Sequence, residues 1–303
     1  MSSPPGPADG STPEAPFRFS AIGTEWRITA DRRVRRSLRQ RILALAEDFD
    51  RVWSRFREDS LVARIAAAEH GGRFEIPERD VPMLDLYDRL VTATNGTVDP
   101  LVGRHLELLG YDARYSLMPD REAIARLTHR DCWAVDVRRE GRVLTTERSV
   151  VIDVGAAGKG YLVDLIAQTL VAAGFDDFLV DGGGDLRHRG TRAIRAGLEH
   201  PSAPGRVIGT VDLQGGAVCA SATNRRAWGE GLHHVLDGRT RSPVSEVVAT
   251  WAMAADAATA DGLATALFVT APECLSDFEF SWVRMLTDGR VQWSKDFPGE
   301  LFL

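Results

Sequence analysis

Cysteine is scarce in this chain of 303 residues. The three cysteines, Cys132, Cys219 and Cys274, lie far apart and form no C-x-x-C pair. Neither a disulfide framework nor a zinc site built from cysteines is therefore expected. Free thiols are typical of a reducing compartment, so we expect a cytoplasmic protein.

Basic charge is also in short supply. The chain has 37 basic and 43 acidic residues and a formal net charge of −6. It lacks the positive field that holds nucleic acids or anionic membranes, so nucleic-acid binding is not expected. Only two of the basic residues are lysines, Lys159 and Lys295. A lysine in a glycine-rich loop, such as Lys159, therefore stands out.

Targeting signals and long apolar runs are missing as well. Residues 1–16 lack the basic start and the apolar stretch of a secretory signal, so we expect a disordered, uncleaved tail. The most apolar window, Val247 to Thr270, contains Asp256 and Asp261. A charge at the centre of a bilayer costs about 2.5–3.5 kcal/mol. We therefore expect a buried element in this window and no membrane span.

Residues 17–303 are expected to form a single domain, because 44% hydrophobic residues are enough to bury a core. The apolar periodicities predict strands and helices without a regular βαβα order, which favours an α+β fold. The expected helices cover residues 34–56, 81–94, 160–173 and 254–267. The expected strands cover residues 17–28 with a turn at Gly23, 150–154, 178–180, 206–213 and 218–220, with hairpins at 133–146 (strands 133–137 and 143–146) and at 282–293.

The stretch VIDVGAAGKGYLVD predicts a strand that ends at Asp153, a glycine-rich turn, and a helix that begins near Lys159. Backbone N–H groups, the helix dipole and the ammonium group would then converge on one point, which suits an anion. The stretch differs from a Walker A loop, because Asp153 replaces the first glycine and Gly160 replaces Ser or Thr. An ordinary glycine turn between a strand and a helix is the alternative.

A second glycine cluster, LVDGGGDLRHRG, would let the backbone at Gly182 to Gly184 approach a ligand closely. It lacks the G-x-G-x-x-G spacing of a dinucleotide-binding fold. Its carboxylates, Asp181 and Asp185, would more commonly cap or turn the backbone.

In HHVLDGRTRSP, His234 and Asp237 lie on either side of a short apolar pair. A histidine close to a carboxylate can move protons near neutral pH. The alternative is a histidine whose hydrogen bonds are satisfied by a carboxylate of the turn.

In ADAATADGLATALF, Asp261 and Thr265 are four residues apart and so share one helix face. A carboxylate and a hydroxyl on an apolar face suit Mg²⁺, which takes oxygen ligands. A buried hydrogen bond between the two side chains is the alternative.

Taken in order, these motifs resemble the ApbE family of FAD:protein FMN transferases. The resemblance runs from about Ile22 to Phe268 and implies an α+β fold of mixed sheets and packed helices, with a T-fold-like core and FAD in a cleft. The motifs are GTEWRI, SRFREDSLVARI, GTVDPLVGRHLELLGYD, VIDVGAAGKGYLVDLIAQTL, LVDGGGDLRHRG, HHVLDGRTRSPV and ADGLATALF.

The resemblance also implies a reaction. Such an enzyme uses Mg²⁺ to cleave the pyrophosphate of FAD, attaches FMN by a phosphoester bond to a Thr or Ser of an acceptor protein with an FMN-binding domain, and releases AMP. By similarity, Asp261 and Thr265 are side-chain metal ligands and Ala156 offers its backbone carbonyl. His234 is the candidate base for the acceptor hydroxyl, with Asp237 orienting it. Without an export signal in this chain, the acceptor would be a cytosolic domain.

Several FAD contacts are implied in the same way. Ile22 and Phe56 fall where the family flanks the isoalloxazine ring, although Met and Tyr are usual at these positions. The remaining expected contacts are Gly110, Tyr111, Asp153, Lys159, Gly183 and Val235. Gly238 replaces a frequent proline after Asp237, so we expect a looser turn. These departures bear on flavin affinity and on the choice of acceptor.

Two other functions fit the same residues. A Mg²⁺-dependent FAD pyrophosphatase would use water in place of the acceptor hydroxyl, admitted by the looser turn at Gly238. Whether FMN appears free or attached to protein separates this activity from transfer. A non-catalytic flavin-binding protein is the third possibility, but it would not need Asp261, Thr265 and His234.

Overall fold

The centre of the molecule is an eight-stranded sheet in which every neighbouring pair of strands is antiparallel. The computed structural model describes residues 15–302, so the predicted tail of residues 1–16 lies outside the described residues apart from its last two. In spatial order, the strands of the sheet are β1 (Phe17–Ala21), β2 (Thr24–Ala30), β6 (Phe178–Asp181), β7 (Asp185–Arg189), β10 (Ala217–Ala222), β13 (Val247–Ala254), β14 (Ser281–Leu286) and β15 (Val291–Trp293).

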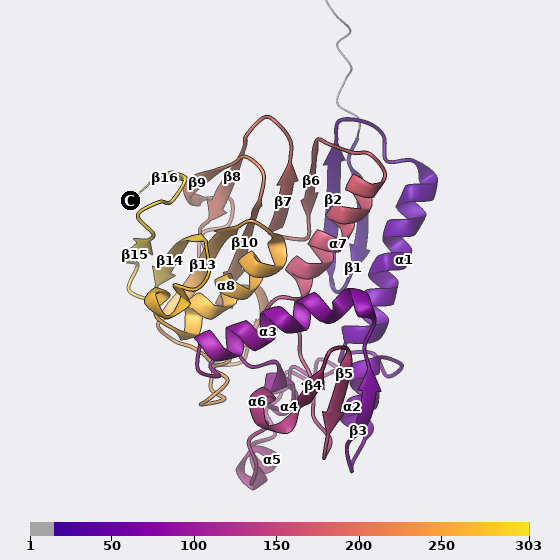
Figure 1. The fold of residues 1–303 in the computed structure, drawn as a ribbon. Helices are drawn as coiled ribbons and strands as arrows, with labels where there is room; N and C mark the ends of the chain where they lie inside the picture. The colour runs from indigo at the N-terminus through magenta and orange to yellow at the C-terminus, as the bar shows by residue number, and fades with distance from the viewer. Residues whose placement is uncertain (1–14, 303) are drawn as a thin grey trace, which may run out of the picture.

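Helices cover one face of this sheet (Figure 1). Helix α8 packs on β10 and β13, α7 packs on β6 and β7, and α3 lies against α8. Their apolar side chains form the main core of the protein together with those of α1. The four helices are α1 (Arg36–Trp53), α3 (Val81–Ala93), α7 (Gly158–Ala172) and α8 (Ala257–Val269).

The opposite face of the sheet carries a second, smaller core. Alternation along β10 supplies both cores, because successive side chains of a strand point to opposite faces. Ala217 and Cys219 belong to the helix-covered core, whereas Val218 belongs to the smaller one. The smaller core also contains side chains of a three-stranded sheet that consists of β8 (Ile194–Glu199), β9 (Val207–Leu213) and β16 (Gly299–Leu301).

A third sheet, in the order β3-β5-β4, lies with four short helices in the lower part of the view in Figure 1. Ile76 and Leu144 from this region are buried in the main core, so it packs against the rest of the chain. Its elements are α2 (Leu61–Ala67), β3 (Gly72–Glu75), α4 (Gly103–Leu108), α5 (Arg121–Arg126), α6 (Trp133–Asp136), β4 (Arg138–Glu140) and β5 (Val143–Thr146). The remaining short elements are η1 (Glu78–Asp80), η2 (Pro100–Val102), η3 (Thr223–Arg226), β11 (Ala227–Trp228), β12 (Leu232–His233) and η4 (Pro272–Leu275).

The α+β prediction is confirmed, and the predicted helices are present with ends shifted by a few residues. The expected turn at Gly23 is also confirmed, since residues 17–30 form the hairpin of β1 and β2. The apolar window that carries Asp256 and Asp261 folds into β13 and α8. In the part of the chain that the structure describes, no helix is long and apolar enough to cross a membrane.

Two predicted strands are wrong. Residues 133–136 form helix α6, because the Trp133 N–H donates to Asp99 at 3.1 Å and its indole N–H donates to Asp88 at 2.7 Å. These contacts anchor the start of a helical turn, and the strand of the hairpin is β4 instead. Residues 150–154 are largely buried but join no sheet, since the Asp153 N–H donates to the Pro100 carbonyl at 2.7 Å.

Candidate active site

A cavity of about 1070 Å³ brings together segments from most of the chain. It is bordered by the turn between β1 and β2, the residues after α1, the start of α7, the turn between β6 and β7, the segment that follows β10, and α8. Eleven of the residues predicted from the sequence line it: Ile22, Phe56, Tyr111, Asp153, Ala156, Lys159, Gly183, His234, Val235, Asp261 and Thr265.

Gly110 and Asp237 are the two predicted residues outside this lining. Gly110 is buried and directly precedes Tyr111. It stabilises the loop that contains Tyr111, because its carbonyl accepts the N–H of Leu117 at 2.8 Å. Asp237 Oδ1 accepts the backbone N–H groups of Arg239 at 2.7 Å and Thr240 at 3.0 Å. Asp237 thus caps its own turn, and the described residues show no hydrogen bond between Asp237 and His234.

Oxygen atoms from two segments meet on one side of the cavity. Thr265 Oγ1 donates to the carbonyl of Ala156 at 3.3 Å, and Asp261 lies one turn earlier on the same face of α8. Asp261 is buried, and its Oδ2 accepts the Gly160 N–H at 2.9 Å. Burial and the neighbouring Asp185 raise the pKa of Asp261 to about 8. A hydroxyl in contact with a carbonyl, with a buried carboxylate on the same helix face as the hydroxyl, fits the donor set of a hard divalent cation such as Mg²⁺.

Gly160 allows this arrangement because it lets α7 and α8 approach closely. A Cβ atom at this position would lie 2.1 Å from the carbonyl oxygen of Ala257 and 2.7 Å from Cβ of Asp261. Any side chain would therefore push the two helices apart. The first turn of α7 then directs a backbone N–H at Asp261, as expected for a carboxylate at a helix N-terminus.

Lys159 forms a salt bridge with Asp185, which is fully buried on β7. Burial alone would lower the pKa of Lys159, but the carboxylates of Asp185 and Asp261 reverse this effect and hold it above its usual range. Within the described part of the chain, Oδ1 of Asp185 has no hydrogen-bond partner. The ammonium group is therefore already neutralised by a carboxylate of the protein.

Asp153 is paired in a similar way. Its Oδ2 accepts from Nε of the buried Arg55 at 2.6 Å, and its Oδ1 accepts the Gly155 N–H at 2.7 Å. Burial would raise the pKa of Asp153, but the Arg55 guanidinium outweighs it and the pKa lies below its usual range. Arg55 also donates to the carbonyl of Tyr111 at 2.7 Å, so it joins the glycine-rich turn to the aromatic side of the cavity.

Four aromatic rings, Phe56, Tyr111, Tyr115 and Trp228, form a wall of the cavity. Tyr115 stacks on Phe56 with a centroid distance of 5.4 Å and an interplanar angle of 8°. Tyr111 meets Phe56 edge-on at 5.3 Å and stacks on Trp228 at 5.5 Å. Offset and edge-to-face contacts of this kind are the favourable ones for aromatic pairs.

Phe56 therefore already has stacking partners, because the Arg55 guanidinium also lies over its ring at 4.2 Å. The most exposed ring of the wall is Tyr115, at 54% exposure. Sequence reasoning missed both Tyr115 and Trp228. For Tyr115, the only signal in the sequence was its position four residues after Tyr111. The turn that brings Tyr115 onto Phe56 has a positive φ at Tyr115, and no sequence pattern indicated that turn.

His234 is half-buried, and its Nδ1 is shielded from solvent without a hydrogen-bond partner. Burial, with the positive charge of Arg226 and the neighbouring His233, lowers the pKa of His234 to about 4. The imidazole is therefore neutral at neutral pH and can accept a proton at a free ring nitrogen. Its backbone N–H donates to the carbonyl of Arg226 at 3.3 Å.

The turn after His234 is tighter than predicted. Gly238 is buried, and its N–H donates to the carbonyl of Thr97 at 2.7 Å. A Cβ atom here would lie 2.5 Å from the carbonyl oxygen of Gly96. The glycine thus permits a close contact between two loops, and the expected loosening that would admit water is wrong.

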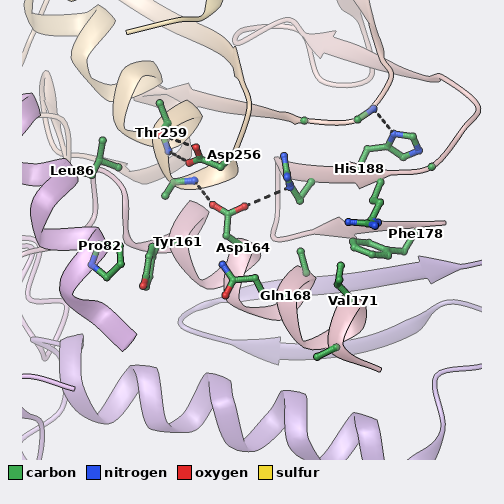
Figure 2. Close-up of a pocket in the computed structure, with 18 of the residues that line it drawn as sticks. Pro82, Leu86, Tyr161, Asp164, Gln168, Val171, Phe178, His188, Asp256 and Thr259 are labelled. Atoms are coloured by element: carbon green, nitrogen blue, oxygen red, sulfur yellow. Dashed lines mark hydrogen bonds and ion pairs between the residues drawn. The ribbon is translucent and has the colours of Figure 1, made fainter. Parts of the chain in front are cut away.

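A second cavity, of about 830 Å³, lies on the other side of α7 and α8 and contains none of the predicted site residues (Figure 2). Asp164 on its lining accepts the N–H groups of Ala257 at 3.0 Å and Ala258 at 2.8 Å. Asp256 caps the same helix by accepting the Thr259 N–H at 2.8 Å. Both carboxylates therefore hold the first turn of α8, the helix whose next turns carry Asp261 and Thr265.

The fold and the site define an α+β protein whose main cavity joins an aromatic wall, a neutral histidine and a cluster of oxygen ligands. This combination suits a ligand that has both a flat ring and a negatively charged group. The model of the ApbE family matches residues 22–278, so the chain belongs to the ApbE family.

Individual relatives agree with this assignment. The FAD:protein FMN transferase of Klebsiella pneumoniae (strain 342) is 27% identical over 291 residues, which cover 87% of this chain and 82% of that protein. The ApbE protein of Thermotoga maritima has a crystal structure with a TM-score of 0.82 at 27% identity, over 93% of this chain and 97% of that one. The flavin transferase ApbE of Vibrio cholerae shares the fold, with a TM-score of 0.80 at 23% identity over 93% of this chain and 97% of that one.

Proposed function

We propose that this protein is a Mg²⁺-dependent FAD:protein FMN transferase that attaches FMN to a Thr or Ser hydroxyl of an acceptor protein and releases AMP. The observation that carries the proposal is the common lining of the main cavity, where His234, the oxygen cluster on α8 and the aromatic wall face one space. The K. pneumoniae relative named for this activity matches most of the chain and supports the same function.

Asp261, Thr265 and the carbonyl of Ala156 are the residues that would hold Mg²⁺. Their oxygen-only donor set and the burial of Asp261 support this assignment. When bound, the cation would supply charge neutralisation at the pyrophosphate. Gly160 and the first turn of α7 keep Asp261 in place through the backbone hydrogen bond to its Oδ2.

His234 would act as the general base. In the transfer, the acceptor oxygen forms a bond to the phosphorus of the FMN half while the bond from that phosphorus to the bridging oxygen breaks. The hydroxyl proton moves to the imidazole and AMP leaves with the electron pair of the broken bond. A neutral imidazole that lines the main cavity supports this role. Asp237 would act on His234 only through the backbone of the turn.

The FAD ring would bind against the aromatic wall. Tyr111 and Tyr115 offer aromatic surface, and Phe56 supports Tyr115 by stacking on it. Ile22 at the turn between β1 and β2 offers an apolar side chain. Gly183, Val235, Asp153 and Lys159 complete the expected FAD-binding lining. Of these, Asp153 and Lys159 would work through their salt bridges, which hold the turn before α7 in shape.

The partner would be a flavoprotein with an FMN-binding domain, in a reducing compartment such as the cytoplasm. The three cysteines Cys132, Cys219 and Cys274 are free thiols, which supports a reducing environment.

The direct test is to incubate the purified protein with FAD, Mg²⁺ and an FMN-binding-domain acceptor, and to measure the intact mass of the acceptor together with released AMP. We expect the acceptor to gain the mass of one FMN for each AMP released. Excess EDTA should abolish both signals, as should Asp261→Ala, because each removes the cation from the oxygen cluster.

The other outcomes are distinct. AMP with free FMN and no gain in acceptor mass would establish a pyrophosphatase and contradict transfer. FAD that stays bound and intact with two different acceptors would indicate a flavin-binding protein. Activity that is unchanged in excess EDTA would contradict the metal site.

A further inference from the structure

The main cavity is lined by several cationic side chains, and their partners differ. An anionic ligand is best held by a cation that is not already neutralised by the protein, because a carboxylate partner competes with the ligand. The lysine and arginine side chains of the lining are Arg55, Arg57, Lys159, Arg225 and Arg226.

Four of these five have a carboxylate partner. Arg55 is bound to Asp153 at 2.6 Å, and Lys159 is bound to Asp185. Arg57 contacts three carboxylates, of which Asp59 is the closest at 2.8 Å, and Arg225 contacts Glu199 at 2.5 Å. Lys159, the lysine that stands out in the sequence, is therefore already paired and is not free to bind an anionic ligand.

Arg226 is the exception. It is exposed at the end of η3, and within residues 15–302 no carboxylate lies within salt-bridge distance of its guanidinium. The guanidinium carbon is 6.0 Å from the ring centroid of Tyr111, which belongs to the aromatic wall. Its positive charge also lowers the pKa of His234, Asp153 and Asp261, which lie on three other parts of the lining.

The backbone fixes this position. The carbonyl of Arg226 accepts the N–H of His234, and the following strand β11 pairs with β12, which ends just before His234. The start of the Arg226 side chain is thus held next to the candidate base, while the side chain itself extends toward the aromatic wall. Arg226 is thus a cation next to the wall for the flavin ring, and its charge also acts on Asp261 of the oxygen cluster, as a group that binds the pyrophosphate of FAD would require.

We propose that Arg226 binds the pyrophosphate of FAD and neutralises the charge that develops on the departing AMP phosphate. The inference rests on the proposed function, since it assumes that FAD is the ligand. A guanidinium suits this role because its planar donors match two phosphate oxygens at once and its charge persists at every physiological pH. Arg226 would thus be a further catalytic residue, in addition to His234 and the metal ligands.

The experiment compares Arg226→Gln and Arg226→Lys with Arg195→Gln, a control whose arginine is bound to Asp212 at 2.8 Å and does not line the main cavity. Equilibrium binding of FAD and of riboflavin, which lacks phosphate, is measured by flavin fluorescence in EDTA. Arg226→Gln should weaken FAD binding about 10- to 100-fold and leave riboflavin binding within about twofold. Arg226→Lys should recover part of the loss, and Arg195→Gln should leave the binding of both ligands unchanged.

Three results would overturn the inference. FAD affinity that is unchanged in Arg226→Gln, while the unaltered protein binds FAD, would remove Arg226 from the site and leave the proposed function intact. An equal loss for FAD and riboflavin would assign Arg226 to the aromatic wall through Tyr111. An unaltered protein that binds no FAD would overturn the proposed function and this inference with it.

Discussion

At the scale of single residues, the site depends on polar groups that are buried with incomplete partners. Nδ1 of His234 and Oδ1 of Asp185 are both shielded from solvent without a hydrogen bond. Such groups cost stability, and proteins keep them mainly where a ligand or a reaction uses them. The pairing of Lys159 with Asp185 belongs to the same pattern, because the buried Asp185 that it neutralises lies next to the oxygen cluster and helps to raise the pKa of Asp261.

His234 gives a prediction for the pH dependence of stability. Its pKa is about 4 in the folded protein and about 6.5 when unfolded, so the unfolded chain binds the proton more readily between these values. The free energy of unfolding should therefore fall as the pH drops from about 6.5 to 4, by about 3 kcal/mol from this residue. The measurement is urea unfolding of the unaltered protein and of His234→Gln from pH 4 to 7. A difference between the two that stays constant with pH would contradict the buried, neutral histidine.

At the scale of elements, α8 is the helix on which the oxygen cluster depends, and its first turn is held by two carboxylates. Asp256 lies at the N-cap, and Asp164 reaches across from α7 (Figure 2). Burial raises the pKa of Asp164 to about 6 in spite of its two backbone hydrogen bonds. The metal-ligand pair on α8 is therefore supported from the cavity on the other side of the two helices.

The cap of α8 can be tested by Asp256→Ala. Losing the hydrogen bond to the Thr259 N–H should lower the free energy of unfolding by about 1 kcal/mol, and Asp256→Ser should recover most of the loss. Asp120→Ala is the matched control, since Asp120 caps α5, a helix with no buried residue. Chemical denaturation of the three variants measures the free energy of unfolding. An equal decrease for Asp256→Ala and Asp120→Ala would contradict the conclusion that the cap of α8 contributes more to stability than the cap of α5.

At the scale of the whole molecule, one apolar core runs through most of the chain. It contains Phe17 of the first strand and Phe278 near the end, and it includes Ile76 and Leu144 from the region of the third sheet. This continuity favours the sequence prediction that residues 17–303 form a single domain. The cavity depends on the same continuity, because its walls come from segments as far apart as Ile22 and Val269.

A single domain predicts one cooperative unfolding transition. Calorimetry of the whole chain should give one peak whose calorimetric and van't Hoff enthalpies agree. FAD with Mg²⁺ should move that peak to higher temperature, because a ligand that binds only the folded state stabilises it by mass action. Two separate peaks, with the first assigned to the region of β3, β4 and β5, would contradict the prediction.

The sequence by itself determined the class of fold, the principal helices and eleven of the residues that line the cavity. Periodicity placed Asp261 and Thr265 on one face of a helix, and this depends only on the pitch of that helix. It also marked the glycine-rich turn before α7, since the turn residues and the apolar run are adjacent in the chain.

Only the tertiary structure decided which charges neutralise one another. Arg55 meets Asp153 across 98 positions of sequence and Lys159 meets Asp185 across 26, and no local pattern encodes such pairs. The same holds for the stacking of Tyr115 on Phe56 and for the turn at Gly238 that packs against Gly96. It also holds for Arg226, because its lack of a carboxylate partner among residues 15–302 depends on where each described carboxylate lies. Helix pitch and turn chemistry act between neighbours in the chain, whereas salt bridges and stacking act between neighbours in space.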